Sequence, residues 1–270
     1  MTEPFGRRLA DAVAARGPLC VGIDPHGPLL ERWGLVDSPE GLARFTDAVV
    51  DALAGTVAVL KPQLAFYERH GSRGLAVLED GVARARAAGA LVLLDAKRGD
   101  IGSTMDGYAG YLRPDHPMAA DALTVSPYLG PGSLQPAVDA ARRHGGGLFV
   151  LARTSNPDAG TLQHAVVDGR SVAQLVVDTV RGWNAADASG SFGVVVGATL
   201  PELDVDLTGL GGPVLAPGLG AQGGSVADLR RLFDRGTTVV PTVSRDVLAA
   251  GPDPAGLRAA AERWAAVLAG

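Results

Sequence analysis

The sequence predicts a (β/α)8 TIM barrel that forms a single domain over residues 1–270, and three observations favour this fold class. Short, almost continuously apolar runs recur eight times along the 270-residue chain. Longer, Ala-rich amphipathic stretches lie between them, so that strands alternate with helices. No low-complexity segment or linker divides the chain. An open doubly wound sheet is the alternative, but such a sheet has no reason to stop at eight strands.

The eight predicted strands are apolar along most of their length, as expected of parallel strands that are covered on both faces. In chain order they span residues 18–24, 57–61, 90–96, 121–125, 147–152, 192–197, 213–217 and 237–241. Amphipathic segments such as GLARFTDAVVDALAG, GLAVLEDGVARARAAG and SVAQLVVDTVRGW predict helices between them. The longest connection, 153–191, opens with the turn-forming RTSNPDAG, which predicts a loop before a helix that starts near Ser171.

Composition and charge argue against several classes of function. The net charge of -5 and the pI near 5.5 disfavour a non-specific nucleic-acid surface. The single cysteine, Cys20, lies in an apolar run and fits a small buried side chain in a reducing cytoplasm. No run approaches the ~18 apolar residues of a membrane span, and no secretory signal is recognisable. We therefore expect a cytoplasmic protein without a membrane or nucleic-acid partner.

Charged residues stand at the predicted C-terminal ends of the strands, which is where TIM barrels carry their active sites. Asp24 and Lys61 end the first two strands, and the third runs into LVLLDAKRGDIGST with Asp95, Lys97 and Asp100. Asp95 and Lys97 are two apart, so on a continuing strand they share a face with Cα atoms ~7 Å apart. A structural ion-pair network is one interpretation. Charges of both signs on neighbouring strands favour electrostatic catalysis instead.

A second cluster follows the seventh and eighth strands. The glycine-rich segment LAPGLGAQGG (215–224) comes first, and VSRDVL places Ser244 and Arg245 directly after the eighth strand. Backbone N–H groups beside an arginine predict a phosphate site at this end of a barrel. No P-loop is present, and the histidines lack metal-ligand spacing, so the sequence indicates no metal or other cofactor. The histidines are His26, His70, His116, His144 and His164.

These segments resemble the orotidine 5′-phosphate decarboxylase family. DAKRGDIG fits its Asp-x-Lys-x-x-Asp signature, and VGIDPH, VLKPQLAFYE, SPYLG, GVVVGAT, LAPGLGAQGG and VSRDVL are similar to other family segments. The resemblance covers nearly the whole chain and is strongest to the bacterial long-chain branch (type 2), which carries TSNP after the fifth strand. RGDIG differs from the more widespread FHDIP, but the three signature charges are intact.

The resemblance implies an enzyme that decarboxylates orotidine 5′-phosphate to UMP, the last step of de novo pyrimidine synthesis, without a cofactor. It implies that Lys97 donates a proton to C6 of the pyrimidine. Asp95 would lie beside the departing carboxylate, while Lys61 and Asp24 would bind the ribose hydroxyls.

The resemblance also implies a homodimer with shared active sites. Asp100 and Thr104 would reach into the site of the partner subunit, and Ser126 would bond the edge of the pyrimidine. The phosphate end would be formed by Pro217, Gln222, Arg245 and the closing loop 218–224.

Two alternatives remain open at this stage. A sugar-phosphate decarboxylase or aldolase of the same barrel could use Lys97 as a Schiff-base lysine or hold Mg²⁺ on the carboxylates. A non-catalytic barrel could simply bind a phosphorylated ligand, although such a barrel has no need of Asp95, Lys97 and Asp100 together.

Overall fold

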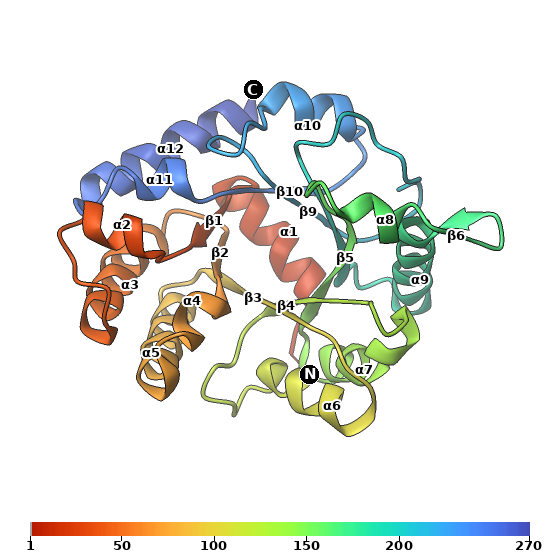
Figure 1. Ribbon diagram of the computed structural model, residues 1–270, viewed down its shortest axis with the longest axis horizontal. Coiled ribbons are helices and arrows are strands. Elements are labelled where there is room, and N and C mark those ends of the chain that lie inside the picture. The colour runs from red at the N-terminus through yellow and green to blue at the C-terminus, as the bar shows by residue number, and fades with distance from the viewer. Residues whose placement is uncertain (1) are drawn as a thin grey trace.

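The computed structural model of the chain describes residues 2–270, and its eight parallel strands close into a barrel (Figure 1). The closed order is β1-β10-β9-β8-β5-β4-β3-β2, so each strand pairs with the next barrel strand along the chain. The predicted fold class is confirmed, and every predicted strand overlaps an observed one. The barrel strands are β1 (Cys20–Ile23), β2 (Val59–Pro62), β3 (Leu91–Arg98), β4 (Ala122–Val125), β5 (Gly147–Arg153), β8 (Phe192–Val196), β9 (Val214–Pro217) and β10 (Val239–Val243).

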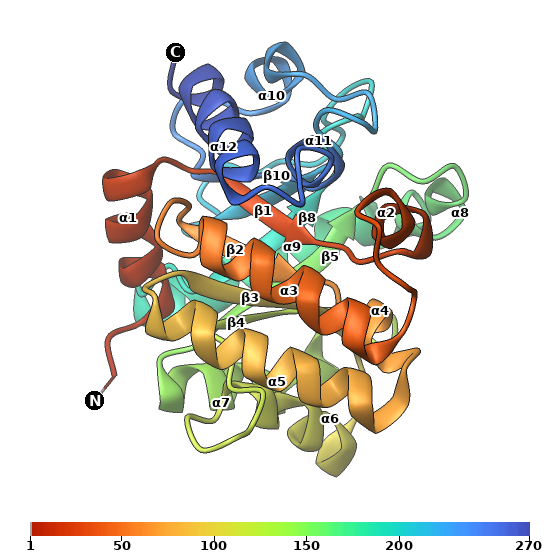
Figure 2. The same cartoon turned by 90° about the vertical axis from the view of Figure 1, so that its left-hand side faces the viewer.

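Helices surround the barrel and also close one end of it. The longer ones are α1 (Phe5–Arg16), α3 (Pro39–Leu53), α5 (Gly71–Ala87), α6 (Gly102–Ala109), α7 (Gln135–His144), α9 (Val172–Asp187), α10 (Val226–Leu232) and α12 (Pro254–Ala269). Short helices in the loops are α2 (Gly27–Arg32), α4 (Leu64–Glu68), η1 (Gly110–Leu112), η2 (Pro131–Leu134), α8 (Ala159–Gln163) and α11 (Arg245–Leu248). Figure 2 shows α1 at one end of the barrel and α2, α4 and α8 at the other. Among residues 2–270, no helix is both long and apolar enough to span a bilayer.

The predicted helix near Ser171 is confirmed, because Ser171 is the N-cap of α9 and its side chain accepts a hydrogen bond from the Gln174 amide. The expected loop before it contains more structure than predicted, namely α8 and a hairpin of β6 (Val166–Val167) and β7 (Arg170–Ser171). The hairpin turns at Asp168 and Gly169, which have φ of 50° and 77°. An Asp-Gly pair is a common hairpin turn. It was not recognised from the sequence, because the strands on either side are only two residues long.

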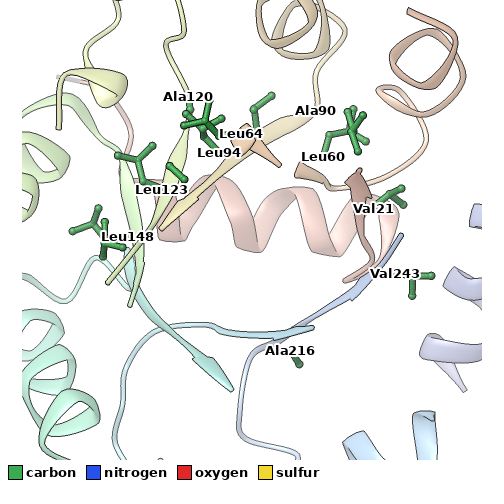
Figure 3. Close-up of a cluster of buried hydrophobic side chains, with 14 of the residues drawn as sticks. Val21, Leu60, Leu64, Ala90, Leu94, Ala120, Leu123, Leu148, Ala216 and Val243 are labelled. Atoms are coloured by element: carbon green, nitrogen blue, oxygen red, sulfur yellow. The ribbon is translucent and has the colours of Figure 1, made fainter. Parts of the chain in front are cut away.

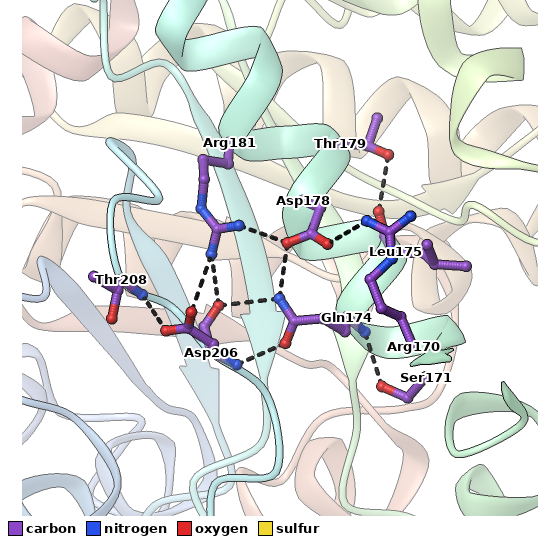
Figure 4. A network of polar contacts seen from close by, with 9 residues as sticks. All are labelled: Arg170, Ser171, Gln174, Leu175, Asp178, Thr179, Arg181, Asp206 and Thr208. Atoms are coloured by element: carbon purple, nitrogen blue, oxygen red, sulfur yellow. Dashed lines mark hydrogen bonds and ion pairs between the residues drawn. The ribbon is translucent and has the colours of Figure 1, made fainter. Parts of the chain in front are cut away.

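A polar network fastens this hairpin to α9 and to the segment that precedes β9 (Figure 4). Arg170 Nη1 donates to Asp178 at 2.9 Å, and Arg181 Nη1 donates to the other Asp178 oxygen at 2.5 Å. The amide of Asp206 donates to the Gln174 side chain at 2.7 Å, and that side chain donates back to the Asp206 carbonyl at 3.2 Å. These bonds join the β5-to-β8 connection to the segment around Asp206, which leads from β8 to β9.

Two apolar clusters hold the barrel together. The larger one fills the space between the strands and the outer helices, where Val21, Leu60, Leu94 and Leu123 point away from the barrel axis (Figure 3). The smaller one lies inside the barrel and is closed from below by α1 through Phe5, Leu9 and Ala12. Its other residues are Ala58, just before β2, and the strand residues Cys20, Val59, Leu91, Leu93, Ala122, Phe149, Val195, Leu215 and Val240.

Candidate active site

The inward faces of several strands change from apolar to polar toward the C-terminal rim. Side chains two residues apart on a strand point to the same face, and on four of the strands an apolar interior residue is followed on that face by a polar one. Burial of the lower layer by α1 leaves only the upper layer facing an open space. The lower and upper residues are Val59 and Lys61, Leu93 and Asp95, Ala122 and Thr124, and Val240 and Thr242.

A cavity of about 280 Å³ lies above this polar layer, at the C-terminal ends of the strands. Most of the site residues that the sequence predicted line it together, although they come from distant parts of the chain. The predicted residues on the cavity wall are Asp24, Lys61, Asp95, Lys97, Pro217, Gln222 and Arg245.

The Asp95 carboxylate is the centre of a hydrogen-bonded charge array. Oδ2 receives Lys61 Nζ at 2.8 Å, and Oδ1 receives Lys97 Nζ at 2.6 Å. The Thr124 hydroxyl donates to the same Oδ1 at 2.7 Å and accepts from the Lys97 amide at 3.0 Å. A buried carboxylate is stable when it is paired and hydrogen-bonded in this way.

The array keeps its charges at neutral pH. Burial alone raises the pKa of Asp95, but the charges of Lys61 and Lys97 outweigh burial and hold that pKa below its ordinary value of 3.8. Burial lowers the pKa of Lys61, but the charges of Asp95 and Asp24 outweigh it and raise that pKa above 10.5. The site therefore holds a fixed carboxylate between two ammonium groups, which can stabilise or repel charge that develops in the cavity.

Lys97 reaches Asp95 from an unusual backbone conformation. Its φ is 49°, and the pairing of β3 with β4 shifts between Leu94 and Arg98. Positive φ is uncommon in residues other than glycine, and strain of this kind gathers at functional sites. The two side chains meet as predicted, but through a bulge and not on the regular strand that the spacing suggested.

The other end of the cavity is formed by the glycine-rich loop and the start of α11. Gly218, Gly220 and Gly223 all have positive φ, and Gly220 packs so closely on Asp246 that a Cβ there would collide with it. Several backbone N–H groups of the loop bond within it, from Gly220 to Gly224, from Gly223 to Gly220 and from Gly224 to Gly218, so the loop folds compactly at the edge of the cavity. Arg245 begins α11 beside this loop and lines the same cavity, so the wall combines a cation with glycine backbone.

Three predicted residues do not line the cavity within one chain. Asp100 accepts a hydrogen bond from the amide of Ile101 at 2.8 Å, and Thr104 is exposed on α6. The predicted role of both across an interface is not tested by a single chain and stays a prediction. Ser126 lies beyond the end of β4, where its amide donates to the Arg98 carbonyl, whereas Thr124 from the same strand faces the cavity.

Several polar residues of the wall were not identified from the sequence. Thr124 and Thr242 are buried polar residues inside strands that are otherwise apolar, and this interruption was the available signal. Among residues 2–270, no group of three or more His, Cys, Asp or Glu side chains is arranged to hold a metal ion. The lining residues missed were Gln63, Phe66, Thr124, Leu151, Thr154, Val195, Leu215 and Thr242, whereas Ser244 of the predicted second cluster does line the cavity.

Comparison with known sequences gives the family of this site. Residues 17–261 match the sequence model of the orotidine 5′-phosphate decarboxylase / HUMPS family. This range includes the whole charge array and the glycine-rich loop. The chain belongs to this family. A Streptomyces coelicolor protein named orotidine 5′-phosphate decarboxylase is 61% identical over 267 residues, which cover 97% of this chain and 96% of the relative. A relative of the same name from Salinispora arenicola is 60% identical over 265 residues, with 97% and 95% coverage.

Solved structures of the orotidine 5′-phosphate decarboxylase family have the same fold. One from Streptomyces avermitilis, provisionally named as such an enzyme, has a TM-score of 0.95 at 59% identity and covers 99% of this chain and 95% of its own. The Leishmania donovani OMP decarboxylase has a TM-score of 0.76 at 31% identity, with 98% of each chain covered. The family resemblance drawn from the motifs is therefore confirmed.

Proposed function

We propose that this chain is a carboxy-lyase that converts orotidine 5′-phosphate to UMP in the cavity at the C-terminal rim of the barrel. One observation carries the proposal: the Asp95 carboxylate lies between the ammonium groups of Lys61 and Lys97 on the wall of a cavity that also reaches Arg245. The names of the relatives support the same substrate. In this proposal residues 1–270 act as one domain in the cytoplasm, with neither nucleic acid nor membrane as partner.

The chemistry asked of the site is the stabilisation of a carbanion. The bond between C6 and the carboxylate carbon breaks, CO2 leaves, and the electron pair stays on C6, where no adjacent carbonyl can delocalise it. An ammonium group ~4 Å away contributes on the order of 4 kcal/mol at an effective dielectric near 20. In our proposal Lys97 supplies this charge and then transfers a proton from Nζ to C6, which completes UMP.

Asp95 holds the catalytic lysine and faces the departing group. Because its lowered pKa keeps it ionised, it opposes the substrate carboxylate with like charge, and this opposition disappears as CO2 forms. Its hydrogen bonds also fix Nζ of Lys97, so the proton donor is in place before the bond breaks. Both effects favour the transition state over the bound substrate.

The parts of the substrate far from C6 have their own binding groups. Lys61 and Asp24 would hold the ribose hydroxyls, while Gln222 and Arg245 would bind the phosphate with Pro217 beside them. Closure of loop 218–224 over the phosphate would convert this remote binding energy into stabilisation of the transition state.

A second copy of the chain would complete each site. Ile101, Tyr128 and Leu129 are exposed hydrophobic residues that follow the neighbouring strands β3 and β4, with exposures of 63%, 75% and 52%. Apolar side chains gathered on one face favour an interface, and a twofold dimer would bury the same face on both copies. Asp100 and Thr104 lie in the same region, so each could enter the partner's cavity from there.

The test is to add orotidine 5′-phosphate to the purified protein and follow the loss of its ultraviolet absorbance, with UMP identified as the product. We expect turnover that resists EDTA and that leaves no adduct after borohydride reduction. Inhibition by EDTA or a trapped adduct would favour the metal-dependent or Schiff-base alternatives. Phosphate-ligand binding without any turnover would favour the non-catalytic barrel.

A further inference from the structure

The turn that carries Asp24 is held by two groups that flank α4, Gln63 before the helix and Arg69 after it. The carbonyl of Ile23, at the end of β1, accepts a hydrogen bond from the Gln63 amide at 3.2 Å. The carbonyl of Pro25 accepts one from Nη2 of Arg69 at 3.0 Å. Asp24 therefore lies between Ile23 and Pro25, whose carbonyls both accept hydrogen bonds from the segment that follows β2.

Arg69 makes four hydrogen bonds with its planar guanidinium. Nη1 and Nη2 donate to the two carboxylate oxygens of Asp37, both at 2.7 Å, and Nε donates to the Phe66 carbonyl at 3.2 Å. The fourth bond is the one to Pro25. Only arginine offers this many donors in a fixed fork, so no other side chain could hold these groups at once.

The Asp24 carboxylate depends on this anchoring for its position. Its Oδ1 atom is buried and has no hydrogen-bond partner among residues 2–270, although Asp24 lines the cavity. No bond therefore fixes that oxygen, and the backbone of the turn must place it. Phe66 also lines the cavity, and its ring lies 6.3 Å from that of His26, so Arg69 braces two adjoining parts of the wall.

We propose that Arg69 and Asp37 form a clamp that positions Asp24 to bind the sugar hydroxyls of the substrate. Neither residue lines the cavity, so both are positioning residues and not catalytic ones. The inference rests on the proposed function and deepens it. A misplacement of about 1 Å by a change remote from the chemistry can cost on the order of 100-fold in rate. The hydrogen bonds from Arg69 lower the pKa of Asp37, as expected of donors that stabilise its ionised form.

A double-mutant cycle tests the clamp. The variants are Asp24→Asn, Arg69→Gln and their combination, and kcat/KM for orotidine 5′-phosphate is measured together with Tm. We expect Arg69→Gln to lower kcat/KM roughly 10- to 100-fold. In the Arg69→Gln variant, adding Asp24→Asn should lower kcat/KM by a much smaller factor than in the wild type, because Asp24 is already misplaced.

Two further variants distinguish positioning from a general loss of structure. The kcat/KM of Arg69→Lys should lie between those of Arg69→Gln and the wild type, because an ammonium group can reach Asp37 or Pro25 but cannot hold both. Arg73→Gln is the matched control, since Arg73 at the start of α5 pairs with Glu40 at the start of α3 and both side chains are 66% exposed. We expect it to keep wild-type kcat/KM. If Arg69→Gln does not fold, Arg69→Lys takes its place in the cycle.

The outcomes separate this inference from the proposed function. If the wild type decarboxylates but the Asp24 and Arg69 effects multiply independently, the clamp is wrong and the function stands. The same holds if Arg69→Gln behaves like Arg73→Gln. If the wild type does not decarboxylate, the cycle is repeated with calorimetric affinity for UMP, where the same non-additivity supports the clamp and additivity rejects it.

Discussion

Nζ of Lys97 lies 2.6 Å from Oδ1 of Asp95, although a single residue separates the two in the chain. The contact is possible because Lys97 adopts a φ of 49° at a bulge in β3, which turns its side chain back over the carboxylate. The lysine side chain remains 44% exposed, whereas that of Asp95 is 9% exposed. The lysine therefore projects from a buried carboxylate into the space where a substrate would bind.

Lys97→Ala should abolish decarboxylation and leave the fold intact. The substitution removes both the charge beside C6 and the proton donor, while Lys61 and Thr124 still bond the Asp95 carboxylate and keep it paired. Turnover of orotidine 5′-phosphate and the thermal unfolding curve are the two measurements. A purified, folded variant with near-wild-type kcat would rule out the proposed role of Lys97.

Thr124→Val should lower kcat by roughly 10- to 100-fold, the cost of one hydrogen bond to a charged group of about 1.5–3 kcal/mol. The hydroxyl is buried and joins Asp95 to the amide of Lys97, so its loss loosens the array. Thr46→Val is the control, because that hydroxyl is also buried but bonds Leu42 and Tyr67 away from the cavity. Equal kcat in the two variants would mean that Thr124 is structural only.

Asp95→Asn should destabilise the protein at neutral pH by roughly 3–5 kcal/mol, because it leaves Lys61 buried without its partner charge. The folded-state pKa of Asp95 lies below the ordinary value of 3.8, so its ionised form stabilises the fold above that pH. This contribution is lost as the pH falls through the folded-state pKa. The difference in free energy of unfolding between wild type and variant should therefore shrink below about pH 4.

Urea unfolding at a series of pH values measures this difference. Asp80→Asn serves as the matched control, since Asp80 lies 3.5 Å from Arg84 on the surface of α5 with its side chain 65% exposed. We expect less than about 1 kcal/mol from this exposed pair. If the free energies of unfolding of the wild type and Asp95→Asn differed by the same amount at every pH, the lowered pKa of Asp95 would be contradicted.

Mixing Lys97→Ala with Asp100→Ala should restore activity that neither variant has alone. If each site combines Lys97 of one chain with Asp100 of the other, a hybrid dimer carries one site with both lesions and one site with neither. Random pairing makes half the dimers hybrid, so about a quarter of wild-type activity should return. Subunit exchange is verified by native mass spectrometry, and an exchanged mixture without activity would place Asp100 within its own chain.

The sequence predicted the barrel and its charged rim because both depend on a local pattern. Apolar runs that end in Lys61 and Asp95 are visible without knowledge of any long-range contact. Thr124 was missed, since threonine is common in strands and the polar interruption of the apolar run does not by itself reveal the bond to Asp95 on β3. The φ of Lys97 was equally hidden, because the surrounding bulge and not the residue type imposes it.

The placement of α1 decides how molecules travel through this protein. Phe5 and Leu9 fill the lower mouth of the barrel, and the ring of Phe5 meets that of Phe149 edge to face at 6.0 Å. In residues 2–270, α1 therefore covers the N-terminal ends of the strands, and the cavity lies at the opposite rim beside loop 218–224. In the proposed reaction the nucleotide and CO2 would both pass this loop, so its movement would limit the rates of substrate binding and product release alike.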